Sequence, residues 1–235
     1  HAGIESAMSE AVSFREEHRD GAARTGVLTT PHGPVLTPAF MPVGTRGTVR
    51  AVDARDLGEA GAQMVLANTY HLMLRPGAGT VARLGGLHGF MAWEGPILTD
   101  SGGYQVLSLK PKVDEDGVAF HSTYDGAAVR LTPEGAVAVQ EALGPDIAMM
   151  LDVPVALPAP RDRVRRAMER TLRWAERARA AHRRPDQALF GIVQGGTDPE
   201  LRAESAAATA ALGFPGFGIG GLAVGEAAPE RLGAL

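Results

Sequence analysis

Cysteine is absent from the 235-residue sequence, which excludes disulfides, iron–sulfur clusters and thiolate zinc sites within this chain and is typical of a cytoplasmic protein. No apolar run approaches the roughly 18–20 residues that a membrane span needs, so we expect no membrane contact. The first residues hold no basic segment leading into an apolar stretch, and a secretory signal is not expected. The net charge of −4 argues against a globally basic nucleic-acid binder, while a local basic patch stays open.

The residues that are present describe a globular chain. Hydrophobic residues make up 45% and charged residues 21%, which is enough apolar material for a buried core. The length suits one large α/β domain or two small ones. Residues 1–20 are rich in Glu, Ser and Arg and predict a frayed N-terminal extension, so the folded domain is expected over 21–235.

Apolar runs recur along the chain, separated by segments with helical signals. Because these runs are continuous, they predict strands buried on both faces, as in a parallel sheet. The expected strands are 63–68, 96–100, 146–152, 188–194 and 216–221, preceded by a hairpin and a buried strand over 26–44. The expected helices are 53–60, 132–143, 161–182 and 199–211.

This alternation of strands and helices predicts an α/β fold with a parallel sheet, either doubly wound or of the barrel type. About six βα units are visible, whereas a closed barrel needs eight. Residues 118–123 and 127–131 flank a Tyr-Asp-Gly turn and predict a β-hairpin inserted into this series.

The residues that end the expected strands form the most informative pattern. The carboxyl ends of parallel strands share one face, where sites are built, so these residues should converge on one pocket. They are Asn68, Asp100 with Ser101, Asp152, Gln194, and Gly220 with Gly221. The simpler interpretation is that strand ends are polar because loops begin there, but two Asp residues directly after apolar strands favour a site.

Such a set suits the hydrogen-bonding edge of a purine. A carboxylate accepts two parallel bonds, as from guanine N1–H and N2–H₂, and a Gln amide with a Gly N–H can donate to O6. Tyr104 could stack on the base, and a carboxylate beside a glycosidic carbon can act as nucleophile, acid or base. The Gly-rich turn near Gly220 could instead hold a phosphate.

Other candidate features are weaker. His71 is more simply a packed loop histidine than a catalytic one, and His121 and His182 each lack a second ligand at metal-binding spacing, so no metal site is expected. Ten arginines over 161–184 would suit an RNA-facing stripe, but a solvated outer helix is the favoured interpretation.

Four segments resemble the tRNA-guanine transglycosylases, or queuine tRNA-ribosyltransferases, in the same order along the chain. They are 67–77 (ANTYHLMLRPG), 88–106 (HGFMAWEGPILTDSGGYQV), 190–196 (FGIVQGG) and 218–226 (GIGGLAVGE). The resemblance covers roughly residues 20–235. It implies a (β/α)8 barrel with insertions that exchanges guanine at the tRNA wobble position for a 7-deazaguanine, a queuosine precursor in bacteria, by double displacement.

The resemblance also implies roles for single residues. Asp100 matches the general acid/base, and Ser101, Gly102, Gly103 and Tyr104 match the pocket wall and stacking ring. Asp152 matches the carboxylate that reads the N1–H/N2–H edge. Gln194 and Gly221, with Leu222 alongside, match the elements that recognise O6 and the base's side chain, and Glu226 matches an acid that orients the local peptide.

Two departures from the family pattern shape our expectations. The family's Asp nucleophile and Cys-rich zinc site lie later than Leu235, so we expect a C-terminally truncated barrel domain that is inactive alone, with no cofactor and no zinc in this chain. Val153-Pro154 stand where many bacterial members carry Glu-Cys, which leaves the identity of the deazaguanine open. The implied partners are tRNA and the guanine or 7-deazaguanine base, with a possible homodimer of the full-length protein.

Two other functions stay open. One is a non-catalytic accessory subunit of a transglycosylase, which the presence of Asp100, Asp152 and Gln194 argues against. The other is a different barrel enzyme that binds a phosphorylated ligand at the Gly-rich turn.

Overall fold

A computed structural model describes residues 11–235. The chain begins with a three-stranded antiparallel sheet of β1 (Ser13–Asp20), β2 (Ala23–Thr30) and β3 (Gly33–Thr37). The predicted hairpin over 26–44 is confirmed as β2–β3, followed by β4 (Val43–Gly44). The expectation that residues 1–20 are frayed is wrong for Ser13–Asp20, because β1 pairs along its length with β2; residues 1–10 lie outside the described residues.

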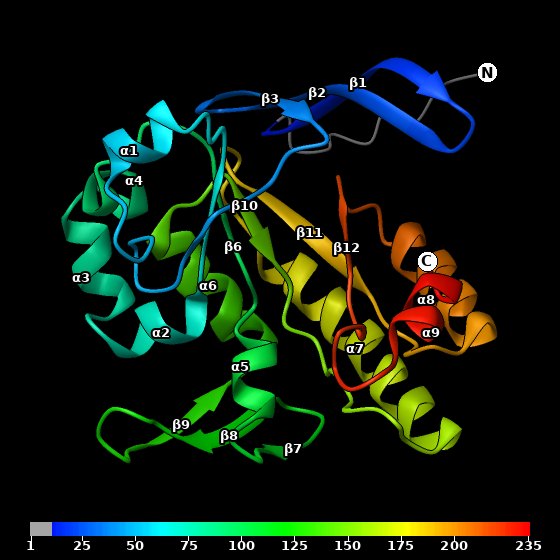
Figure 1. The fold of residues 1–235 in the computed structure, drawn as a ribbon. Helices are drawn as coiled ribbons and strands as arrows, with labels where there is room; N and C mark the ends of the chain where they lie inside the picture. Colours follow the sequence, from blue (N-terminus) through cyan, green and yellow to red (C-terminus); the bar gives the residue numbers. More distant parts are fainter. Residues whose placement is uncertain (1–10) are drawn as a thin grey trace, which may run out of the picture.

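A six-stranded parallel sheet forms the centre of the molecule, in the order β12-β11-β10-β6-β5-β4 (Figure 1). Its strands after β4 are β5 (Val65–Ala67), β6 (Ile97–Thr99), β10 (Ile147–Met149), β11 (Ala188–Val193) and β12 (Phe217–Ile219). The predicted α/β class with about six βα units is confirmed. The sheet ends at β4 on one side and at β12 on the other.

The long helices begin where sequence signals place them. In α6 (Pro133–Leu143) the Thr132 side chain accepts from the Gly135 N–H, and in α8 (Pro199–Ala211) Asp198 accepts from the Leu201 N–H, with proline at the first helical position of each. The other helices predicted from the sequence are α1 (Ala54–Glu59) and α7 (Arg161–Ala181).

Five short helices escape the sequence analysis because each spans only five or six residues, too few to show a period of 3.6. They are α2 (Thr69–Leu74), α3 (Ala78–Arg83), α4 (Gly86–Met91), α5 (Gly103–Leu107) and α9 (Ala228–Gly233).

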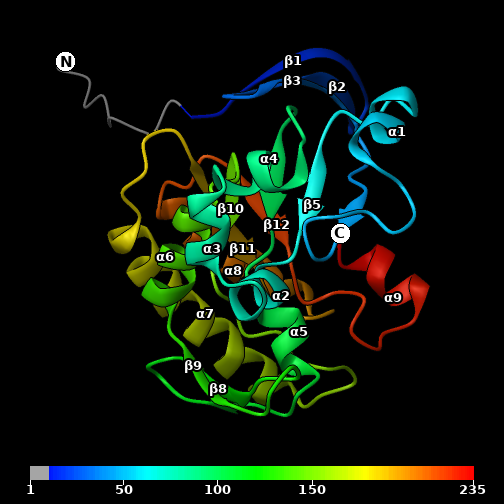
Figure 2. The same cartoon turned by 90° about the vertical axis from the view of Figure 1, so that its left-hand side faces the viewer.

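The inserted hairpin is confirmed as β8 (Val118–His121) and β9 (Ala128–Leu131), to which β7 (Lys112–Val113) adds a third strand. It is held to α7 by the Trp174 indole N–H, which donates to the Glu115 carbonyl at 2.9 Å. The β7–β9 sheet and the β1–β3 sheet lie at opposite ends of the central sheet in both views (Figures 1 and 2).

The core lies on both faces of the central strands. Ile147, Ala148 and Met149 of β10 are all buried, which explains their continuous apolar run. On the outer side β10 packs against α6, where the Gln140 amide bonds to both the N–H and the carbonyl of Met149. Among the described residues, no helix has the length and apolarity required to cross a membrane.

Candidate active site

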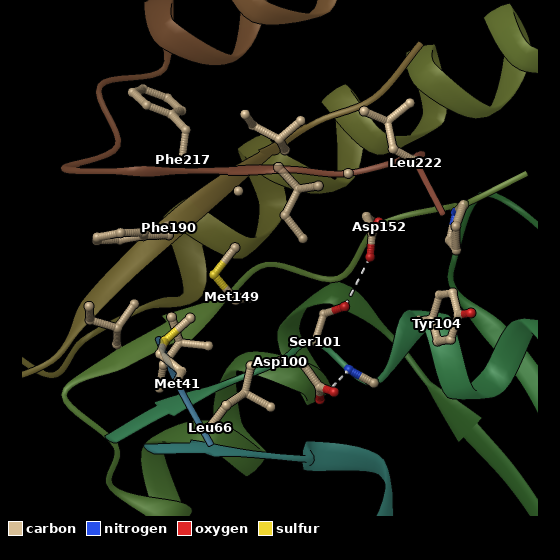
Figure 3. Close-up of a pocket in the computed structure, with 18 of the residues that line it drawn as sticks. Met41, Leu66, Asp100, Ser101, Tyr104, Met149, Asp152, Phe190, Phe217 and Leu222 are labelled. Atoms are coloured by element: carbon tan, nitrogen blue, oxygen red, sulfur yellow. Dashed lines mark hydrogen bonds between the residues drawn. The ribbon is translucent and has the colours of Figure 1, made fainter. Parts of the chain in front are cut away.

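A cavity of about 550 Å³ runs along one face of the parallel strands and reaches their carboxyl ends. One end of its wall is polar and includes Asp100, Ser101, Gly102, Tyr104, Asp152, Gly220 and Gly221 (Figure 3). The remainder is apolar and includes Met41, Leu66, Met149, Phe190 and Phe217, with Leu28 and Val35 contributed by the β1–β3 sheet. Asp100, Ser101, Asp152, Gly220 and Gly221 thus line one cavity, as the strand-end pattern predicted, whereas Asn68 and Gln194 do not line it.

Asp100 follows β6 directly, and its backbone N–H continues the ladder by donating to the Ala67 carbonyl at 3.2 Å. Four donors surround its carboxylate. The N–H groups of Thr69 and Gly102 donate at 2.9 and 3.1 Å, the Gln105 amide donates at 3.0 Å, and the Asn68 amide provides the fourth bond. The carboxylate is thus held in one orientation at the cavity wall.

Burial raises the pKa of Asp100 above its ordinary value, although the hydrogen bonds from Asn68, Thr69, Gln105 and Gly102 oppose the rise. A carboxyl whose pKa is raised in a pocket is suited to gaining and losing a proton.

Asp152 lies three residues beyond the end of β10 and is 8% exposed. Its Oδ1 accepts from the Ser101 hydroxyl at 2.9 Å, and its Oδ2 accepts from the Gln194 amide at 2.6 Å. Ser101 therefore connects the strand end that carries Asp100 to the Asp152 carboxylate.

The pKa of Asp152 is raised to about 6. Burial is the main cause, the charge of Asp100 adds to it, and the hydrogen bonds from Ser101 and Gln194 oppose it. The two carboxylates thus influence each other, as expected for groups that face one cavity.

Glycine is required at three positions around Asp152 and Gln194. A side-chain carbon on Gly103 would lie 2.7 Å from Asp152 Oδ1, and one on Gly220 would lie 2.9 Å from the Gln194 amide nitrogen. Gly221 has φ +69° and would place such a carbon 2.5 Å from Gln194 Oε1. The Gly220-Gly221 pair therefore allows the last strand to pack closely over Gln194.

The structure separates the predicted residues into those that line the cavity and those that support it. Tyr104 lies at the rim with 60% of its surface exposed, and Leu222 also lines the cavity. Asn68, Gly103 and Gln194 stand behind the wall and contact the two carboxylates or their partners.

Glu226 is outside the cavity and holds the loop that carries Leu222. Its carboxylate accepts from the N–H groups of Ala223 and Val224, and these backbone bonds lower the pKa of Glu226. Ala223 adopts the left-handed conformation within this turn, with φ +59°.

Sequence reasoning missed two residues that hold Asp100, namely Thr69 and Gln105. Thr69 donates through its N–H to the carboxylate and through its hydroxyl to the Asp100 carbonyl. Gln105 stands within the quoted DSGGYQV segment, five residues after Asp100, so its position in the first turn of α5 was the available signal.

A second cavity, of about 860 Å³, adjoins the first at Tyr104, Pro154 and Val224. Its wall carries four cationic side chains, Lys110, Arg163, Arg166 and Arg170. Most other arginines of the 161–184 segment form ion pairs with nearby acids, as the outer-helix interpretation predicts. In the wall of the second cavity, Arg166 pairs with Asp162 and Arg170 with Glu115. Arg163 has no ion-pair partner in the part of the chain that the structure describes.

The histidines considered from the sequence lie outside the cavity wall. His71 Nδ1 is 3.0 Å from the Tyr124 hydroxyl, and burial together with the Arg46 charge lowers the His71 pKa. The expected loop position is wrong, because His71 lies in α2. The sequence spacing indicated no metal site, and that expectation stays a prediction. The structure nevertheless brings His32, His88 and Asp146 together at the other end of the sheet.

The fold and the site define a βα-repeat protein whose largely apolar cavity ends in a polar wall at the carboxyl ends of its parallel strands. A model of the family described as queuine tRNA-ribosyltransferase matches residues 19–235. The chain belongs to this family, as its motifs predicted.

Curated relatives agree with this assignment. The chain is 59% identical over 227 residues to a queuine tRNA-ribosyltransferase of Gloeobacter violaceus, a match that covers 96% of this chain and 60% of the relative. It is 57% identical over 215 residues to one of Thermus thermophilus, covering 91% of this chain and 56% of the relative. The chain therefore spans less than two thirds of the length of these relatives.

Proposed function

We propose that this chain carries the base-recognition site of a tRNA-guanine transglycosylase, which exchanges guanine at the wobble position of tRNA for a 7-deazaguanine by double displacement. The observation that carries the proposal is that Asp100 and Asp152 line the same cavity, with Ser101 bonded to Asp152 between them. Membership of the queuine tRNA-ribosyltransferase family supports this reaction over other uses of a βα fold.

Asp152 is proposed to read the N1–H and N2–H₂ edge of the base. Each of its oxygens already accepts one bond within the protein, and an ionised carboxylate has acceptor capacity for further donors. The Gly221 backbone N–H is the proposed donor to O6, with Leu222 beside the base, and the Gln194 amide holds Asp152 from behind the cavity wall. The exposed Tyr104 ring at the rim is proposed to stack on the base.

Asp100 is proposed to act as the general acid/base. The four donors fix its carboxylate, while burial raises its pKa towards the range in which proton transfer is useful. The second cavity, with Lys110 and three arginines next to Tyr104, is proposed to receive backbone phosphates of the tRNA. A homodimer and a cytoplasmic location remain predictions.

Binding of free guanine is the direct test of the recognition site. We expect isothermal titration calorimetry to show one binding site per chain for guanine and, separately, for a 7-deazaguanine. Asp152→Asn should weaken binding at least tenfold, because the carboxylate that accepts the paired bonds is lost. This loss agrees with about 1.5–3 kcal/mol for a hydrogen bond to a charged group. A sugar phosphate is the matched control ligand and should not bind this pocket.

Proton transfer is tested separately from recognition. In a preparation that incorporates radiolabelled guanine into tRNA, Asp100→Asn should abolish incorporation while guanine binding persists. Binding of the sugar phosphate in place of guanine, or guanine binding that does not depend on Asp152, would show that the cavity serves another ligand.

A further inference from the structure

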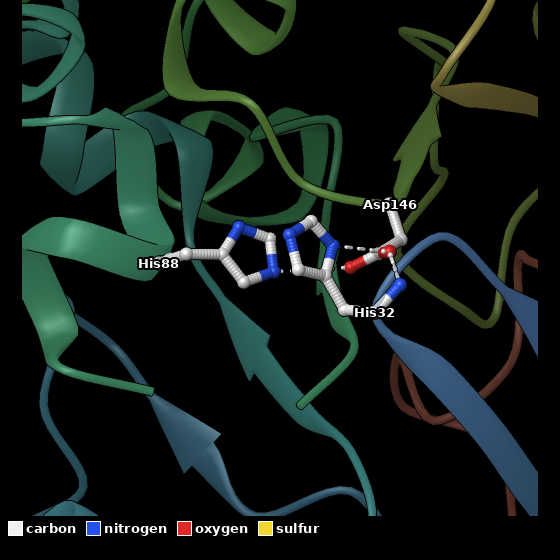
Figure 4. Close-up of side chains that lie close together, drawn as sticks. All are labelled: His32, His88 and Asp146. Carbon is white, nitrogen blue, oxygen red and sulfur yellow. Dashed lines mark hydrogen bonds and ion pairs between the residues drawn. The ribbon is translucent and has the colours of Figure 1, made fainter. Parts of the chain in front are cut away.

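Two imidazole rings and one carboxylate meet at the amino end of the central sheet, opposite to the base pocket. His32 comes from the β2–β3 turn, His88 from α4, and Asp146 from the residue that precedes β10 (Figure 4). His32 Nδ1 is 2.8 Å from Asp146 Oδ1, and His88 Nε2 is 3.2 Å from Asp146 Oδ2. The two rings are stacked with their centroids 3.5 Å apart, so both ring nitrogens face the same carboxylate.

The carboxylate is positioned independently of the two rings. The backbone N–H groups of Ile97 and His32 donate to Oδ2 and Oδ1 at 2.8 and 3.1 Å, and Asp146 is only 1% exposed. Backbone donors therefore orient the buried carboxylate, as outer hydrogen-bond partners orient metal ligands.

The three side chains supply the donor set that divalent transition metals prefer, two imidazole nitrogens and a carboxylate. Their ligand atoms all lie within 4.8 Å of one another. Metal–nitrogen and metal–oxygen bonds are roughly 2.0–2.2 Å long. One ion can therefore lie between each histidine nitrogen and the Asp146 oxygen to which it is now hydrogen-bonded. The ring nitrogen that now faces Asp146 can bind the ion when the ring proton sits on the other ring nitrogen.

The two histidines are also accessible, whereas the Asp146 side chain is fully buried. His32 and His88 line a cavity of about 480 Å³ whose wall includes Glu141 and Asp186. The His32 side chain is 41% exposed and the His88 side chain 15%. An ion can therefore enter from solvent and keep water on its remaining positions.

We propose that His32, His88 and Asp146 form a binding site for a divalent transition metal ion of the zinc type, separate from the base pocket. The ion would replace the two hydrogen bonds between the histidines and Asp146 by three metal bonds, one from each side chain, and join the β2–β3 turn and α4 to the start of β10. Its role is positioning and stabilising, since the site lies at the end of the sheet away from Asp100 and Asp152.

Titration of the metal-free chain with Zn²⁺ tests the proposal directly. We expect calorimetry to show one ion per chain and thermal denaturation to show a midpoint that rises with Zn²⁺ concentration, because the ion binds the folded state. Co²⁺ should give a visible ligand-field absorption at the same stoichiometry, and Mg²⁺, which prefers oxygen ligands, should give neither effect.

His32→Ala is the most informative variant, because the backbone N–H to Asp146 is retained and the side chain is part-exposed. We expect His32→Ala and His88→Ala each to weaken Zn²⁺ binding at least tenfold and to remove the Co²⁺ absorption, while circular dichroism confirms that they fold. His121→Ala, at an exposed histidine of the inserted hairpin, is the matched control and should bind as the unchanged chain does.

Three results would overturn the proposal. They are no binding of Zn²⁺ or Co²⁺ at millimolar concentration, equal affinity in the unchanged chain and in both cluster variants, or loss of binding on His121→Ala.

Discussion

Asp152 in the wall of the base pocket accepts a 2.6 Å hydrogen bond from the side-chain amide of Gln194, and both residues are buried. The bond joins the ends of β10 and β11. It offsets part of the cost of burying a carboxylate, since hydrogen bonds to the charged form favour ionisation. The ionisation of the proposed recognition residue therefore depends on a neighbour that does not line the cavity.

Gln194→Leu should raise the pKa of Asp152 above its value of about 6, because the bond that favours the carboxylate is removed. Guanine binding at neutral pH should weaken by roughly tenfold, in line with about 1–3 kcal/mol for a lost partner of a buried polar group. Calorimetric titration with guanine across pH measures both effects.

Gln187→Leu provides the matched control, because Gln187 is also a buried glutamine but donates to the Gln140 and Pro145 carbonyls away from the cavity. It should lower stability and leave guanine binding unchanged. Equal guanine affinity in the Gln194→Leu and unchanged chains would contradict the proposed role of this pair.

The pH dependence of stability should report Asp152. Its folded pKa of about 6 lies above the ordinary 3.8, so the folded state holds this proton more tightly than the unfolded state. Its contribution to folding is therefore greatest below about pH 4 and is lost as the pH rises through about 6, a change on the order of 3 kcal/mol. Asp152→Asn should gain stability relative to the unchanged chain by up to this amount between acid and neutral pH.

Urea denaturation at acid and neutral pH measures this difference. Asp20→Asn, at an exposed acid at the end of β1, is the control and should show no such change. A stability difference between Asp152→Asn and the unchanged chain that stays constant with pH would refute the raised pKa.

Gly103→Ala should impair base binding through a steric effect on Asp152. The added methyl group would lie 2.7 Å from Asp152 Oδ1, which must then move away from its bond with Ser101. We expect about tenfold weaker guanine binding and a loss of roughly 1–3 kcal/mol of stability, as for an overpacked buried site.

Gly58→Ala, in the exposed part of α1 with open space around it, is the control and should be neutral or stabilising by up to about 1 kcal/mol. Unchanged guanine binding in Gly103→Ala would show that the Asp152 position is not needed.

Arg163→Ala tests the proposed phosphate contact. Because Arg163 lines the basic cavity and has no ion-pair partner among the described residues, its loss should weaken tRNA binding and reduce the slope of log affinity against log salt by about 1. Filter binding of tRNA at several salt concentrations provides the measurement.

Arg179→Ala, further along α7 and outside both cavities, is the control and should leave the slope unchanged. The same slope in both variants would place the tRNA elsewhere.

Much of the candidate site follows from one topological rule. Asn68, Asp100, Gln194 and Gly220 each come directly after a parallel strand, and such strands end at a shared edge, so their convergence needs no knowledge of side-chain packing. The bond between Ser101 and Asp152 depends on how two loops pack across that edge, and strand order alone does not give it.

The sequence by itself determined the parallel βα series, the starts of α6 and α8 and the family, because local capping signals, continuous apolar runs and long motifs can be recognised without distant contacts. Tertiary structure alone decided that Asp152 is held by Ser101 and Gln194. It alone brought His32 and His88, which stand 114 and 58 residues from Asp146, onto one carboxylate. The physical reason is that these contacts form only when the sheet packs its ends against separate loops, and neither periodicity nor spacing encodes that packing.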